Sequence, residues 1–318
     1  AVLFTGLIFA ANILLLVDIR RMYPELFPWW RGGNFRIGLG NFFRSNILTG
    51  VSILDLLSLQ GVILLITGSL GAVAVPLFTT LRTLANTAMQ GTGFLLNPIL
   101  PDLVRYHVQR EREKIGAVFR FFWLTTGAVI NGGMVVGLFF VEPVYVLWTR
   151  GKLGFDRVLF VWLVAAVLVR TLSAPLQSYL VAINHLKAQG AASVIRAVVT
   201  GVGVIWLAPR LGLGGVGAVL FVGEFFGSLI LPWWFTRRSL AALGGNEGGF
   251  VDHLAVVSVV AAGLALLTFG MNAWIWPWMA GGTFAVIIAI ALLQWRDLSL
   301  EVKDRAVRSE ERRVGKEC

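Results

Sequence analysis

The sequence predicts an all-α protein, a polytopic bundle of transmembrane helices, and three observations lead to this fold class. Of its 318 residues, 57% are hydrophobic and 14% are charged, with a mean hydropathy of +0.79, whereas soluble domains carry about 25% charged residues. Several stretches reach the ~20 apolar residues that a helix needs to cross the hydrocarbon of a bilayer. None of them alternates like a strand, and a helix satisfies its own backbone in lipid. We therefore expect helices as the spanning elements.

About nine segments have the length and composition of a membrane span. They cover residues 1–17, 45–66, 72–98, 117–141, 158–183, 189–208, 213–235, 251–270 and 273–295. Up to residue 307, alternate connections between them hold 15 lysines and arginines on one side and 4 on the other. The positive-inside rule places the richer set, and with it the C-terminus, in the cytoplasm.

Both ends of the chain are unusual for such a protein. The chain begins without methionine inside an apolar run, so we expect its N-terminus to be cut rather than native. The polar string RSEERRVGKEC at 308–318 resembles a translated sequencing adapter, and we interpret it as an artefact, with a charged cytosolic tail as the alternative. This string holds the chain's one cysteine, so the sequence predicts no disulfide, zinc or thiol chemistry.

The connection at 18–44 contains two prolines, two tryptophans and five arginines. We expect it to lie along the cytoplasmic membrane surface and to join two lobes of an incomplete two-lobe transporter. A second interfacial element is predicted at 104–115, where VRYHVQREREKI has the pattern of a short amphipathic helix.

Polar side chains inside the spans are the candidate site, because a charge at the bilayer centre costs about 2.5 kcal/mol or more. The candidate binding residues share helical faces of the third, fifth and sixth spans, and they are Arg82, Asn86, Gln90, Arg170, Gln177 and Arg196. Such faces would line a wet cavity, or alternatively join helices through hydrogen bonds. Several guanidinium groups in one cavity favour an anionic ligand, since their planar fork matches phosphate or carboxylate. For Arg196 the alternative is snorkelling to the interface.

Two carboxylates, Asp55 and Glu224, lie deepest in apolar sequence. Burial raises the pKa of a carboxyl group toward neutral pH, so either residue could carry H⁺ or coordinate Na⁺ in a coupled transporter. The alternative is a structural ion pair with Arg82 or Arg196. Gly223 and Gly227 flank Glu224 at a spacing that favours close helix packing.

Other motifs do not support an enzyme. Gly212, Gly214 and Gly217 spell GxGxxG, but no strand precedes them, so we expect a tight loop and no dinucleotide site. The three histidines lack metal-ligand spacing, and no nucleophile elbow or phosphate-binding loop is present. We predict no cofactor, no metal and no nucleic-acid partner, because topology already explains the basic residues.

Three stretches carry a resemblance to a known family. They are GSLGAVAVPLFTTLRTLANTAMQGTGFLLNPILPDL at 68–103, EPVYVLWTRGKLGFD at 142–156 and LGLGGVGAVLFVGEF at 211–225. In this order they resemble the carboxyl-terminal half of polysaccharide flippases, the lipid-linked oligosaccharide branch of the multidrug/oligosaccharidyl-lipid/polysaccharide exporter superfamily. Such proteins typically have two six-helix lobes and often two extra helices.

The resemblance implies a domain organisation and a function. Residues 1–17 would be the last helix of the amino-terminal lobe, 18–44 the inter-lobe connection, 45–235 the carboxyl-terminal lobe, and 236–307 two additional helices with a cytoplasmic tail. The implied activity is flipping of an undecaprenyl-pyrophosphate-linked oligosaccharide across the bacterial inner membrane by alternating access. Membrane lipids and the polysaccharide polymerase and ligase are the implied partners.

Three other functions stay open. A lipid II flippase differs mainly in its substrate, and a multidrug exporter of the same superfamily would favour a cavity rich in carboxylates. From another class, a membrane glycosyltransferase or O-antigen ligase would need catalytic carboxylates or a large periplasmic loop, and neither is visible.

Overall fold

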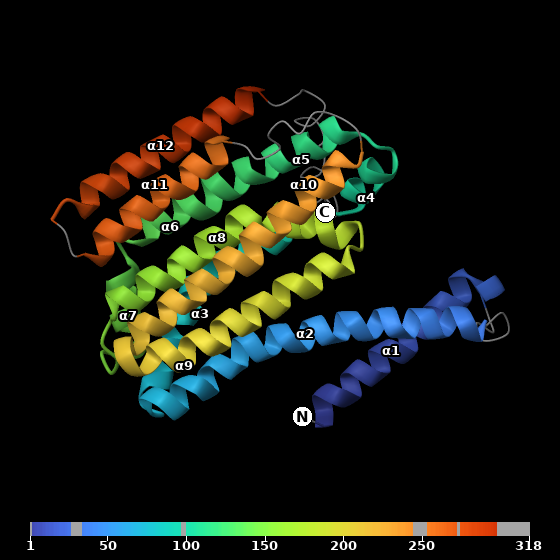
Figure 1. Ribbon diagram of the computed structural model, residues 1–318, viewed down its shortest axis with the longest axis horizontal. Helices are drawn as coiled ribbons and strands as arrows, with labels where there is room; N and C mark the ends of the chain where they lie inside the picture. Colours follow the sequence, from blue (N-terminus) through green and yellow to red (C-terminus); the bar gives the residue numbers. More distant parts are fainter. Residues whose placement is uncertain (1, 27–33, 97–99, 244–252, 272–273, 298–318) are drawn as a thin grey trace. The chain divides into compact units, whose positions relative to one another are not determined.

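The computed structural model describes residues 2–26, 34–96, 100–243, 253–271 and 274–297 (Figure 1). In this part the chain is helical throughout its regular structure, with no strand, as predicted. It divides into two units, Ala1–Thr49 and Gly50–Cys318. The string at 308–318, interpreted above as an adapter, lies outside the described residues.

The first unit contains α1 (Val2–Met22), the short helix η1 (Pro24–Leu26) and the start of α2 (Phe35–Leu70). In the connection predicted at 18–44, the described residues are helical at both ends, in α1 and in α2. Asn34 explains the early start of α2. Its side-chain oxygen accepts hydrogen bonds from the backbone N–H groups two and three residues further on, at 3.0 and 3.3 Å, and so caps the helix.

The second unit holds the end of α2 and the remaining helices. These are α3 (Ala74–Leu96), α4 (Leu100–Val108), α5 (Arg112–Thr125), η2 (Thr126–Asn131), α6 (Gly132–Gly137), α7 (Val141–Thr149), α8 (Arg157–Ala182), α9 (Leu186–Glu224), η3 (Phe225–Ile230), α10 (Leu231–Ala241), α11 (His253–Gly270) and α12 (Trp276–Asp297). Among the described residues, each of the nine predicted segments is mostly helical.

Five stretches in the described part of the chain are long and apolar enough to cross a membrane. They are Thr49–Leu70, Arg112–Gly137, Arg157–Ala182, Leu186–Ala241 and Trp276–Leu293. A shorter apolar helix covers Val256–Gly270. This set of helices indicates a multi-pass membrane protein.

The long helix α9 is a hairpin of two halves. Gly212 interrupts it with a φ of 60° and a ψ of −148°, a conformation that glycine adopts without strain. On either side of this point the halves meet closely: a Cβ on Gly203 would lie 2.5 Å from Val219 Cγ1, and one on Gly223 would lie 2.8 Å from Thr200 Oγ1. The separate spans predicted at 189–208 and 213–235 thus correspond to the two antiparallel halves.

The glycines of the GxGxxG string serve two different purposes. The tight loop predicted there is confirmed at Gly212. Gly217 instead lies inside the second half of the hairpin, where a Cβ would come within 2.8 Å of Trp162 Cβ on α8. Its missing side chain lets α9 pack closely on α8.

The amphipathic helix predicted at 104–115 is only partly right, because α4 covers its beginning and α5 its end, and the chain turns between them. Arg110 adopts a φ of 57°, its N–H donates to His107 O at 3.1 Å, and Glu111 N–H donates to Tyr106 O at 2.9 Å. These two bonds form the cap that commonly ends a helix at a left-handed residue. The segment is therefore split between α4 and α5, a break that hydrophobic periodicity does not reveal.

Helix α8 is the centre of the second unit. It contacts α3, α9 and α11, and in Figure 1 it runs between the α3–α9 side and the α11–α12 side. Leu159, Val167 and Tyr179 along its length are each at most 2% exposed. Its buried polar residues Thr171 and Ser173 consequently lie between helices.

Candidate functional site

Helices α2, α3, α8 and α9 enclose a cavity of about 150 Å³ in the second unit. Its lining is mostly polar or charged, and consists of Asp55, Ser58, Arg82, Arg170, Arg196, Thr200, Leu220 and Glu224. All three candidate arginines and both candidate carboxylates are therefore brought to one place. Two pairs of consecutive helices, α2–α3 and α8–α9, supply them.

The other three candidate binding residues do not line this cavity. Asn86 and Gln90 lie one and two turns beyond Arg82 on α3, where Asn86 is half-buried and Gln90 is exposed. Gln177 donates from Nε2 to Ser173 Oγ at 2.9 Å and to Ser228 O at 3.2 Å. The amide of Gln177 thus joins α8 to η3, which was the alternative of interhelical hydrogen bonding.

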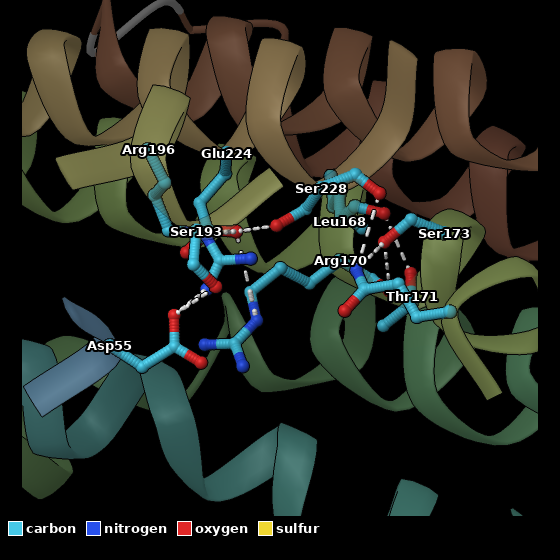
Figure 2. Close-up of polar contacts among 10 residues, drawn as sticks. Asp55, Leu168, Arg170, Thr171, Ser173, Ser193, Arg196, Glu224 and Ser228 are labelled. Carbon is cyan, nitrogen blue, oxygen red and sulfur yellow. Dashed lines mark hydrogen bonds and ion pairs between the residues drawn. The ribbon is translucent and has the colours of Figure 1, made fainter. Parts of the chain in front are cut away.

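Asp55 on α2 is bound by two groups of α9 (Figure 2). Ser193 Oγ donates to its Oδ1 at 2.8 Å, and Arg196 Nη1 lies 3.3 Å from the same oxygen. Ser193 is buried, whereas the Asp55 side chain is 40% exposed. The structural ion pair considered for Asp55 is therefore formed, with Arg196 as its partner, and Arg196 does not snorkel.

Glu224 lies between two arginines. Its Oε2 atom is 3.8 Å from Arg196 Nε and 3.9 Å from Arg170 Nε, and it accepts a short hydrogen bond from Ser228 Oγ (Figure 2). Both arginine distances are ion-pair separations, longer than the ~3.2 Å limit of an N–H···O hydrogen bond. This one oxygen of Glu224 therefore contacts α8, the first half of α9 and η3. It accepts no hydrogen bond from either guanidinium group.

The Nε atom of Arg196 is buried and has no hydrogen-bond partner. An unsatisfied buried donor costs about 1–3 kcal/mol, and more when it is charged. This donor belongs to a side chain that lines the cavity and is only 16% exposed. The site therefore retains hydrogen-bonding capacity that an oxyanion could use.

Glycines allow the two halves of α9 to bring these charges together. A Cβ on Gly227 would lie 3.0 Å from both Ala192 O and Arg196 Cβ. Together with Gly223, this glycine gives the close packing predicted from their spacing. Without that approach, Glu224 could not reach Arg196 from the neighbouring half.

Ser228 is a residue of this site that the sequence did not predict. This buried hydroxyl follows Glu224 by four residues and orients its carboxylate. The spacing of one helical turn was the available signal, because side chains at i and i+4 are neighbours on a helix.

The charges of the cavity suit an anion. Three guanidinium and two carboxylate groups leave a net charge of +1. Among the described residues, no three histidine, cysteine or acidic side chains lie close enough together to hold a metal ion. Protein-family models, curated proteins and solved structures were compared with this chain, and none matches.

Proposed function

We propose that this chain is the carboxyl-terminal part of a lipid-linked oligosaccharide flippase. It would move an undecaprenyl-pyrophosphate-linked oligosaccharide across the bacterial inner membrane during polysaccharide synthesis, and it would not act as an enzyme. The observation that carries the proposal is the cavity in which Arg82, Arg170 and Arg196 converge from three helices. The resemblance of the stretches at 68–103, 142–156 and 211–225 to polysaccharide flippases supports it independently.

The diphosphate of the lipid carrier is the group that the arginines would bind. Guanidinium groups bind phosphate oxygens in pairs of parallel hydrogen bonds, and Arg196 Nε still lacks an acceptor. The isoprenoid tail would remain in the hydrocarbon of the bilayer. A cavity of about 150 Å³ is smaller than the ~300 Å³ or more of typical ligand pockets, so the glycan would need space outside it.

The finer architecture belongs to the same proposal. Nine spans would form the end of one lobe, a six-helix lobe at 45–235 and two additional helices at 236–307, with the C-terminus in the cytoplasm. The excess of lysine and arginine in alternate connections supports this orientation. Transport would proceed by one lobe rocking against the other.

Export of surface glycan tests the arginine assignment. In cells that depend on this protein, Arg170→Ala and Arg82→Ala should reduce export by tenfold or more, while the variants still reach the membrane. Arg120→Ala is the matched control, because Arg120 is exposed on α5 and does not line the cavity. Undiminished export in both cavity variants would reject the proposal, and export of cationic drugs instead would favour the multidrug exporter.

Ion coupling is tested at Asp55. If this carboxylate takes part in coupling, Asp55→Asn should flatten the dependence of transport on pH or Na⁺, because an amide does not titrate. Transport rates measured in inverted vesicles across a pH and Na⁺ series would reveal the change. A dependence equal to that of the wild type would exclude Asp55 from coupling.

A further inference from the structure

Glu224 occupies the position from which a ligand oxyanion would contact the cavity arginines. A single oxygen of its carboxylate faces Arg196 Nε at 3.8 Å and Arg170 Nε at 3.9 Å. Neither distance is a hydrogen bond, and Arg196 Nε has no other acceptor. The pairing is therefore weak compared with the bidentate contact that a phosphate could make with the same groups.

We propose that Glu224 is an internal competitor of the substrate: a phosphate oxyanion displaces its carboxylate from Arg170 and Arg196, and the displaced carboxylate takes up one proton from water. This inference rests on the proposed function, because it assumes that the arginines receive a phosphate. It assigns to Glu224 a displacement step that couples anion binding to proton uptake.

The balance of charge in a low-dielectric site is the reason to expect proton uptake. The cavity has a net charge of +1, and a diphosphate diester carries one negative charge on each phosphate group. Binding would leave one excess negative charge, and an unpaired charge away from water is costly unless the group neutralises. Uptake of one proton by a carboxylate restores neutrality.

Glu224 is better placed to take that proton than Asp55. Its side chain is 14% exposed, against 40% for Asp55, so an unpaired charge would lie further from water at Glu224 than at Asp55. Asp55 also keeps two donors, Ser193 Oγ and Arg196 Nη1, whereas Glu224 on displacement loses both of its arginines. The charged groups that share the cavity with it are Asp55 from α2, Arg82 from α3, Arg170 from α8 and Arg196 from α9.

Calorimetry with inorganic pyrophosphate tests the inference on the full chain in detergent. Titrations in two buffers with different ionisation enthalpies count the protons exchanged for each anion bound. For the wild type we expect net uptake of one proton or more per anion near neutral pH, after correction for the ionisation of free pyrophosphate, because pyrophosphate carries at least the negative charge of the diester. Binding without this uptake overturns the inference and leaves the proposed function intact.

Variants identify the group that takes the proton. Glu224→Gln should bind pyrophosphate about tenfold or more tightly, within the range of coupling between competing ligands, and should lose the proton uptake. Glu142→Gln is the control, because Glu142 pairs with Arg157 outside the cavity and should leave both quantities unchanged. If Glu224→Gln does not fold, Ser228→Ala should tighten binding in the same direction, because it removes the hydrogen bond that holds the carboxylate.

The remaining outcomes are also decisive. Weaker binding in Glu224→Gln, proton uptake that persists in it, or no pyrophosphate binding to either wild type or variant overturns the inference. Proton-linked binding together with glycan export that is undiminished in both Arg82→Ala and Arg170→Ala would reject the flippase while retaining the role of Glu224.

Discussion

Two regions of the second unit contain ion pairs between arginine and glutamate, but the distances within the pairs differ. Arg157 and Glu142, which join α8 to α7, meet at 2.5 Å in a direct hydrogen bond, and the guanidinium group also lies 5.2 Å from the centre of the Phe269 ring. In the cavity, Glu224 is 3.8 and 3.9 Å from its two arginines. The pair of Arg157 and Glu142 is therefore hydrogen-bonded and structural, whereas in the cavity Arg196 Nε remains without an acceptor. The distance between the arginine and the glutamate, rather than the residue types, distinguishes a structural ion pair from a candidate binding site.

Replacement of the two arginines should give the largest contrast in stability. Arg196→Met leaves Asp55 and Glu224 without their shared cation, and breaking such a pair costs about 3 kcal/mol when it is largely buried. Arg157→Met removes a more exposed pair, worth about 1 kcal/mol or less. Thermal unfolding in detergent, followed by circular dichroism, measures both losses. Equal losses would contradict the distinction between the two regions.

A smaller effect is expected from the packing that creates the cavity. Gly227→Ala places a methyl group 3.0 Å from Ala192 O and Arg196 Cβ, and overpacking of this kind costs about 1–3 kcal/mol. Gly263→Ala on α11 is the control, since a Cβ there meets nothing within 4 Å. Relief of glycine's entropy should make the control about 0.5–1 kcal/mol more stable. Equal unfolding temperatures for the two variants would show that the close approach does not matter.

The smallest effect concerns a titratable group outside both regions and outside the membrane-spanning segments. His107 on α4 lies 2.8 Å from the Tyr179 hydroxyl, and burial lowers the pKa of its imidazole below the ordinary value of 6.5. The unfolded chain therefore binds the proton more readily than the folded one. The stability contribution is present above about pH 6.5 and is lost as pH falls through the lowered pKa.

His107→Gln should abolish this dependence. We expect the wild type to lose slightly more thermal stability than the variant between pH 7.5 and pH 5.5, measured in the same detergent. An identical pH response in both proteins would contradict a contribution of the His107 imidazole to the pH dependence of stability.

Apolar composition and length were enough to predict the helices. The third predicted span, 72–98, corresponds to α3 because apolar composition over that length leaves helix as the available structure in lipid. Periodicity does not encode a break such as the left-handed Arg110, which splits the segment at 104–115. It also could not separate Arg82, which lines the cavity, from Gln90, which is exposed two turns further along the same face.

By itself, the sequence determined that this chain is helical, apolar and suited to a membrane, and that a few arginines and carboxylates lie within its spans. Only the tertiary structure decided which of them meet. Asp55 and Arg196 are 141 residues apart, and their contact depends on how α2 and α9 are rotated and packed, which the 3.6-residue period of each helix leaves undetermined. The turn at Gly212 and the close approach at Gly227 place Glu224 between two arginines, because long-range packing sets distances that composition and spacing do not contain.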